Sequence, residues 1–72
     1  MTKEENRKLA DILRQDILAL RKKGYTYQIF FTAINYSASQ FYNFMSHGYS
    51  MKDEKLLMLK QCVELITEGS KA

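Results

Sequence analysis

The chain has 72 residues, one cysteine, no proline and a formal net charge of +3. A domain of this size has a core worth only about 3–5 kcal/mol, so oligomerisation is an expected source of further stability. A single cysteine excludes an intramolecular disulfide, and no pair or cluster of cysteine and histidine is present to bind zinc. We therefore expect one small domain that needs no cofactor and no metal.

The longest apolar runs are too short to span a bilayer, and the charged N-terminal sequence leads into no hydrophobic segment of a signal peptide. We expect a cytoplasmic protein with no membrane partner. Glycine occurs only at positions 24, 48 and 69, so helices can run without interruption between these residues. The sequence predicts an all-α fold, with a compact domain of four helices, or five, over residues 1–68 and a frayed tail over 69–72.

The first predicted helix covers roughly residues 3–23. Thr2 and Glu5 have the spacing of a capping box at its start, and Gly24 follows a run of cations at its end, where the helix dipole favours positive charge. An apolar stripe on one side is expected to face the core. The stripe consists of Leu9, Leu13, Ile17 and Leu20, with Ile12 beside it.

A row of cations runs along the same predicted helix. Arg7, Arg14 and Arg21 are seven residues apart and, with Lys3, are expected to line its outer face. The row is interpreted either as a solvated face or as a stripe that contacts phosphates or an acidic partner.

Two short helices are predicted next, joined by a tight turn at Asn35 and Tyr36. Thr26 is expected to cap the first, which runs from 27 to 34 with Phe30, Ala33 and Ile34 inward. Asn35 tolerates the left-handed conformation that ends a helix without glycine. Ser37 and Gln40 have the form of a capping box that opens the second, over 37–46. Its inward residues are expected to be Ala38, Phe41, Phe44 and Met45.

The free side of the helix over 37–46 carries no charged residue apart from a terminal histidine. Its side chains both donate and accept hydrogen bonds, which indicates a surface that meets another polar surface. They are Ser39, Gln40, Tyr42, Asn43, Ser46 and His47.

The last predicted helix covers roughly residues 51–67, with Ser50 as its cap and Asp53 and Glu54 in its first turn. A core stripe is expected from Leu56, Leu59, Val63 and Ile66. A second apolar stripe lies beside it and consists of Met51, Met58, Cys62 and Leu65. The two stripes cover about half the circumference, which indicates either a dimer interface or a helix sunk deeply between its neighbours.

Two short helices of this kind, the second polar on its free side, resemble the helix-turn-helix of DNA-binding regulators, most closely the phage repressor and Cro type. The resemblance covers roughly residues 24–48. The packing positions of that family hold apolar or aromatic residues here, namely Phe30, Ile34, Tyr36, Phe41 and Phe44. The family also has a small residue in the middle of its first helix, where Phe31 stands in this chain. Either the turn register is shifted or the two helices cross more widely.

The resemblance implies a sequence-specific regulator of the repressor type that binds double-stranded DNA as a homodimer and has no small-molecule substrate. The residues that would face base edges are Ser37, Ala38, Ser39, Gln40, Tyr42, Asn43 and Ser46. Asn43 has the best chemistry, because its amide can bind the N6 and N7 atoms of adenine together. No Arg or Lys of this helix can bind guanine, so the DNA site is expected to be A/T-rich or read through shape.

Affinity is then expected to come from phosphate contacts on both sides of the base-reading helix. The candidates are Lys22, Lys23, Thr26, Tyr27, Gln28, Tyr49, Ser50 and Lys52.

An alternative interpretation is a small helical protein-binding module, such as a phage-type inhibitor of a host protein or an adaptor. Its contact surface would be an aromatic patch of the kind enriched in protein interfaces. The patch would consist of Tyr25, Tyr27, Tyr42 and Tyr49. An enzyme is not expected, because His47 has no acid or thiol at a diagnostic spacing and Cys62 reads as a small apolar residue.

Overall fold

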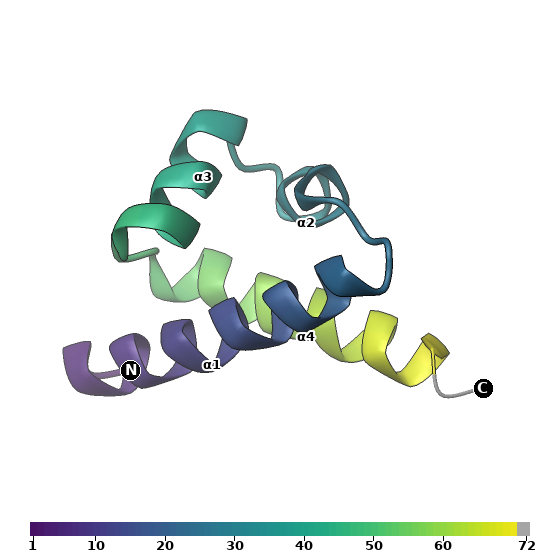
Figure 1. Cartoon of the computed structure of the whole chain (residues 1–72). Coiled ribbons are helices and arrows are strands. Elements are labelled where there is room, and N and C mark those ends of the chain that lie inside the picture. Colours follow the sequence, from purple (N-terminus) through teal and green to yellow (C-terminus); the bar gives the residue numbers. More distant parts are fainter. Residues whose placement is uncertain (71–72) are drawn as a thin grey trace.

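The structure is a computed structural model and describes residues 1–70. Within these residues all regular structure is helical: α1 (Lys3–Lys22), α2 (Tyr27–Ala33), α3 (Ala38–His47) and α4 (Asp53–Ser70) follow one another along the chain (Figure 1). The predicted all-α class and the prediction of four helices are confirmed. Gly69 and Ser70, expected in a frayed tail, continue α4, whereas residues 71 and 72 of that tail lie outside the described part.

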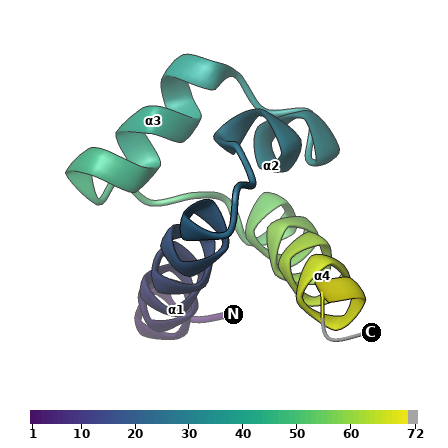
Figure 2. The ribbon, with the colours of Figure 1, turned by 45° about the vertical axis from the view of Figure 1, so that its right-hand side comes forward.

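The four helices form two layers. The long helices α1 and α4 pack against each other, α2 lies on α4, and α3 packs against α2 (Figure 2). The same view places α3 above α1, so each short helix rests over one long helix. The short helices therefore share one side of the molecule.

The core lies between the two layers and draws on all four helices. It consists of Ala10, Leu13, Ile17, Leu20, Phe30, Ile34, Phe41, Phe44, Met51, Leu56, Leu59 and Val63. The three phenylalanines are among its largest fully buried side chains, and burial of each stabilises the fold by about 1.5–3 kcal/mol. Leu9, predicted in the stripe of α1, is half-buried and packs against this core, whereas Ile12, expected beside the stripe, is exposed.

Three apolar residues lie on the opposite side from the one predicted. Ala33, the last residue of α2, and Ala38, the first of α3, are exposed, and each lies at an end of its helix, where fewer neighbours cover it. Met51 is only 3% exposed, since α4 begins two residues after it and its side chain packs into the core instead of extending a helical stripe.

Local signals set most helix ends. At α1 the Glu5 amide donates to the Thr2 hydroxyl and the Thr2 amide donates to the Glu5 carboxylate, which forms the predicted capping box. The bond from the Thr2 amide lowers the pKa of Glu5. Gly24 and Gly48 follow α1 and α3 with positive φ angles of 108° and 68°. The predicted capping box of α1 and the predicted helix ends at Gly24 and Gly48 are confirmed.

Ser50 does not cap α4. The helix starts at Asp53, and its first turn closes where the Leu56 amide donates to the carbonyl of Lys52 at 2.8 Å. Burial of Met51 directs the chain past Ser50 before the helix can begin. Asp53 and Glu54 lie in the first turn, as predicted.

Candidate nucleic-acid interface

The turn between α2 and α3 depends on two polar residues. Asn35 has a positive φ of 54°, the left-handed conformation expected of it, and the Tyr36 amide donates to the carbonyl of Phe31 at 2.8 Å. The Ser37 hydroxyl then accepts from the Gln40 amide at 3.1 Å and caps α3. The Gln40 side chain does not return a bond to Ser37 in this structure, so the predicted capping box is half-formed. The carboxamide of the Gln40 side chain therefore remains exposed on the surface.

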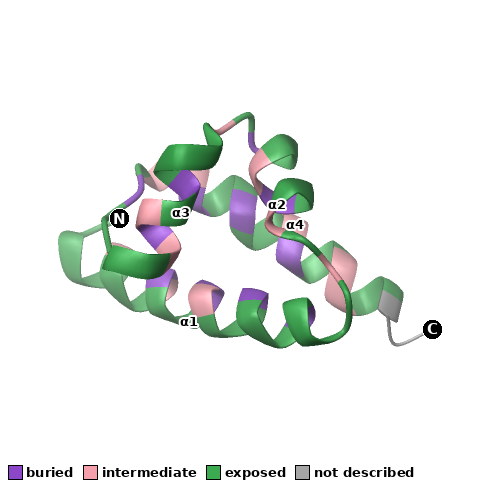
Figure 3. Cartoon of the chain, turned by 45° about the horizontal axis from the view of Figure 1, so that its top comes forward, coloured by how far each residue is buried: buried purple, intermediate pink, exposed green. Residues whose placement is uncertain are grey.

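The outer side of α3 is exposed and uncharged over most of its length, and Figure 3 shows exposed residues along this side of the helix. Ser39, Gln40 and Ser46 are exposed, and Asn43 is half-buried. None of these four side chains makes a hydrogen bond to another residue within 1–70. Their donors and acceptors are therefore free to bind water or a molecule outside the chain.

The remaining predicted base-contacting residues differ in the chemical groups that they expose. The Ser37 hydroxyl is used in the cap but keeps its proton as a donor. Ala38 is exposed and presents only a methyl group. Tyr42 is 50% exposed, and its ring meets Tyr27 edge-on with centroids 5.3 Å apart.

Arg14 lies beneath α3 and not on the outer face of α1. Its side chain is only 15% exposed, and its Nε donates to the carbonyl of Phe44 at 2.7 Å while an Nη donates to the carbonyl of Tyr49 at 2.9 Å. The guanidinium also lies 4.3 Å from the ring centre of Phe44 and pairs with Asp11 at 2.8 Å. The Phe44 carbonyl belongs to the last turn of α3, which leaves its acceptors unpaired and attracts a cation. Arg14 therefore fixes the end of α3 to α1.

Arg21 is exposed, as expected of the outer row, but it also contacts α2. Its guanidinium lies 4.4 Å from the ring centre of Tyr27, whose other contacts are the edges of Phe41 and Tyr42 at 5.6 and 5.3 Å. A cation on an aromatic face contributes about 0.5–1 kcal/mol at such a site. The half-buried ring of Tyr27 thus links α1 to α3, and only its hydroxyl is suited to the predicted phosphate contact.

A second long-helix cation holds α2. Lys55 of α4 donates from its Nζ to the carbonyl of Ile34 at 2.8 Å, directly after the last residue of α2. Both short helices therefore end on a cation supplied by the long helix beneath them, Arg14 for α3 and Lys55 for α2. These contacts were missed from the sequence, because residues 21 and 30 positions apart meet only through the packing.

The predicted phosphate-contacting residues fall into two groups. Lys22, Lys23, Thr26, Tyr27 and Gln28 lie around the start of α2, and the Thr26 side chain is not used as a cap. Tyr49, Ser50 and Lys52 follow the end of α3 and are exposed. In Figure 1 the two groups lie towards opposite ends of α1, which spans about 30 Å. They are suited to different parts of a phosphate backbone.

The predicted dimer residues divide between core and surface. Met51 is buried in the core, so it cannot contribute to a dimer interface as predicted. Met58 and Leu65 are 39% and 64% exposed. Cys62 is half-buried, and burial raises the pKa of its thiol. With α2 they border a shallow groove of about 390 Å³, lined by Ile29, Ala33, Met58, Gln61, Cys62, Leu65 and Ile66. The apolar face thus spans α2 and α4, a combination that the pattern of α4 alone did not indicate.

The four tyrosines proposed as one aromatic patch lie in two places. Tyr27 and Tyr42 contact each other, and Tyr25 is half-buried against the core. Tyr49 pairs instead with His47 beyond the end of α3, with ring centres 5.7 Å apart. The described residues therefore present no single surface of all four.

Comparison with protein-family models, with curated proteins and with solved structures gives no match. No described helix is long and apolar enough to cross a membrane. Within the described residues no group of three His, Cys, Asp or Glu side chains is placed to hold a metal ion.

Proposed function

We propose that the chain is a sequence-specific regulator of the repressor type that binds double-stranded DNA, with α2 and α3 as a helix-turn-helix and α3 in the major groove. The observation that carries the proposal is the outer side of α3, where hydroxyl and amide groups have no partner inside the described chain. Such groups match the donors and acceptors of base edges. Asn43 and Gln40 would read adenine, and Ser39 and Ser46 would bind either kind of base.

The way α3 is held supports the same proposal. A helix that reads bases needs a fixed position, because a displacement of about 1 Å separates a good hydrogen bond from none. Ser37 closes the first turn of α3, and Arg14 binds its last turn. The exposed lysines Lys22, Lys23 and Lys52 would contact phosphates on either side.

The homodimer is part of the proposal. One such domain contacts about half a DNA site, and two copies would place their α3 helices in successive major grooves. The apolar face of Ile29, Met58 and Leu65 is suited to a second copy, since these large side chains surround one groove. Burial of this face would also add to the stability of a small core.

A second candidate function, a protein-binding module, is favoured by one observation. The exposed side of α3 has no lysine or arginine, and Tyr42 stands out from it, 50% exposed. Aromatic residues of this kind anchor protein interfaces. Under this function Tyr42→Ala would abolish capture of the partner, and affinity for DNA would be negligible in the unmodified protein.

Selection of binding sites from a random duplex pool tests the proposal. We expect enrichment of an A/T-rich motif with two related halves, bound at least 10³-fold more tightly than arbitrary DNA at physiological salt. Equal affinity for the enriched and arbitrary duplexes would exclude sequence-specific regulation. Retention of full affinity for the enriched duplex by Asn43→Ala would exclude α3 as the reading element.

A further inference from the structure

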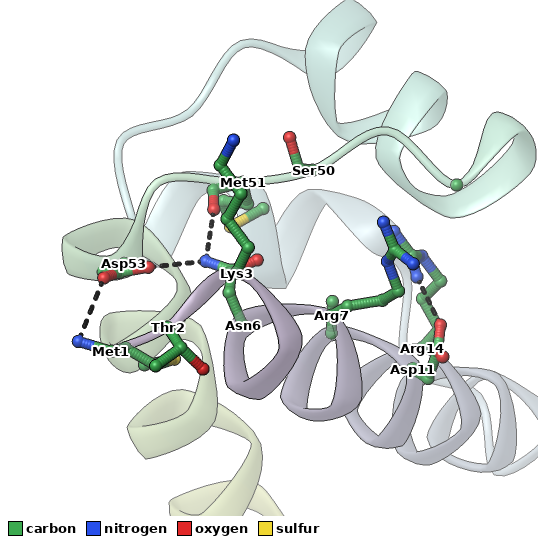
Figure 4. A pocket seen from close by; sticks show the side chains of 12 residues that line it. Met1, Thr2, Lys3, Asn6, Arg7, Asp11, Arg14, Ser50, Met51 and Asp53 are labelled. Carbon is green, nitrogen blue, oxygen red and sulfur yellow. Dashed lines mark hydrogen bonds and ion pairs between the residues drawn. The ribbon is translucent and has the colours of Figure 1, made fainter.

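A polar groove lies beside the end of α3, between the first turns of α1 and the segment 48–53. It has a volume of about 750 Å³, and its lining includes Lys3, Arg7, Arg14, Ser50 and Asp53 (Figure 4). Lys3 and Arg7 were expected on the outer face of α1, either solvated or in contact with phosphates or an acidic partner. In the structure both are exposed and line this groove.

The walls of the groove are tied together. The Asn6 side chain donates to the carbonyl of Met51 at 2.9 Å and to the carboxylate of Asp53 at 2.6 Å. Arg14 donates to the carbonyl of Tyr49 at 2.9 Å. The segment after α3 is thereby held against α1 at two points, so the groove keeps its shape without a ligand.

The groove carries an excess of positive charge. Its two carboxylates are already engaged, Asp11 by Arg14 and Asp53 by Asn6 and the amino group of Met1. Lys3 and Arg7 have no ion pair or hydrogen bond with any other residue from 1 to 70. Two positive charges therefore remain for an anion from outside the chain.

We propose that this groove binds a backbone phosphate of the duplex, with Lys3 and Arg7 as its ligands. This inference rests on the proposed function, because a duplex lying on α3 continues past Gly48 and Ser50, which line the groove. Both cations are exposed, so their affinity for a small free anion is weak, whereas a phosphate on a duplex already held by α3 is supplied at high local concentration. The groove would extend the contact beyond the bases that α3 reads.

The test compares two variants of equal net charge by fluorescence anisotropy over a range of salt concentrations, using the enriched duplex and an arbitrary one. Lys3→Gln/Arg7→Gln removes the groove cations. Lys8→Gln/Lys60→Gln is the matched control, because those lysines are exposed and paired with Glu4 and Glu64 on their own helices. The groove variant is expected to bind both duplexes roughly 10- to 60-fold more weakly at 0.1 M salt. Its salt slope should fall by about 1.8, because a bound homodimer loses one phosphate contact in each of its two grooves, at about 0.9 for each contact. Its discrimination between the duplexes should not change.

Three outcomes separate this inference from the proposed function. If the unmodified protein prefers the enriched duplex but the groove variant behaves like the control, the groove proposal alone fails. If the groove variant loses salt slope while the unmodified protein prefers no duplex, the groove proposal stands and sequence-specific regulation fails. Saturable binding of inorganic phosphate alone, or binding of polyglutamate that the groove variant loses, would overturn the groove proposal. Lys3→Arg/Arg7→Lys keeps the charge and should retain the salt slope.

Discussion

The Arg14 side chain connects three parts of the fold. It joins α1 to α3 and to the segment after α3 through two carbonyl groups, and it covers the ring of Phe44. Asp11 and the two carbonyl groups accept hydrogen bonds from its guanidinium, which is largely removed from water. The same residue therefore serves the fold and the position of the proposed reading helix.

We expect Arg14→Met to lower the free energy of unfolding by about 2 kcal/mol, because it leaves the carbonyls of Phe44 and Tyr49 without their charged donor. Thermal unfolding followed by circular dichroism measures the loss, which corresponds to a fall in Tm of about 8–15 °C for a domain of this size. Arg7→Met is the matched control, since Arg7 has no partner in the described chain and should change stability by less than about 0.5 kcal/mol. Equal losses in the two variants would contradict the role of Arg14.

Asn43 carries the sharpest prediction about specificity. Asn43→Ala should reduce discrimination at one base pair by about 10- to 100-fold, the value of a bidentate amide–adenine contact, without changing the salt slope. Stability should change little, because the Asn43 side chain makes no hydrogen bond within residues 1–70. Competition binding with single-base variants of the enriched duplex provides the measurement. Gln15→Ala, an exposed amide on α1, is the control, and an equal effect from it would contradict base reading by Asn43.

The start of α3 depends on one side chain. The Ser37 hydroxyl accepts from the Gln40 amide and satisfies a first-turn donor that has no partner within the helix. The Gln40 side chain does not reinforce this bond in the structure, in contrast to the complete capping box at Thr2 and Glu5 of α1. The first turn of α3 is therefore more sensitive to its cap than that of α1.

Ser37→Ala should cost about 1 kcal/mol and should speed hydrogen exchange in the first turn of α3. Ser39→Ala makes the same chemical change two residues later, where the hydroxyl has no partner within the described chain, and alanine favours the helix. Its stability should be unchanged or slightly higher. Similar exchange rates in the two variants would show that the Ser37 bond does not hold the turn.

The helices could be predicted closely because their end signals are local. Capping residues, Asn35 and the glycines act within a few residues, and the start of α1 and the turn before α3 lie where these signals place them. The start of α4 could not be predicted in this way, because burial of Met51 overrides the capping signal of Ser50. Ala33 and Ala38 were misplaced since alanine fits either side of a helix.

The site could be predicted only in part for a related reason. The polar side of α3 follows from helical periodicity and is exposed as expected. The roles of Arg14, Arg21 and Lys55 depend on which long helix lies beneath which short one, and a periodic pattern contains no such information. A row of arginines seven residues apart looks the same whether it faces water or the neighbouring helix.

The cations without internal partners and the apolar groove between α2 and α4 are formed by different residues of the surface. The cations without internal partners, among residues 1–70, lie towards the two ends of α1 and after α3, namely Lys3, Arg7, Lys22, Lys23 and Lys52. The exposed apolar face is formed by α2 and α4 and carries Ile29, Met58 and Leu65. Under the proposed function, one molecule would bind DNA and a second copy through different residues.

The dimer prediction rests on Leu65, the most exposed of the large apolar residues, at 64%. If two copies meet through α2 and α4, Leu65→Glu would place a carboxylate in the interface, at a cost of several kcal/mol for removing the charge from water. We expect this variant to be monomeric at concentrations where the unmodified protein is a dimer, as measured by sedimentation equilibrium. Its affinity for a two-half duplex should fall towards that for a single half-site, because the avidity of a second domain is lost.

Leu18→Glu is the matched control for this prediction. Leu18 is also a leucine exposed on a long helix, at 48%, but it lies on α1 and outside the groove between α2 and α4. The control should remain dimeric and should keep its affinity for the two-half duplex, since the same charge stays in water. Dissociation of both variants would place the interface elsewhere. A monomeric unmodified protein that still binds the two-half duplex cooperatively would mean that the DNA, and not the apolar face, brings the two copies together.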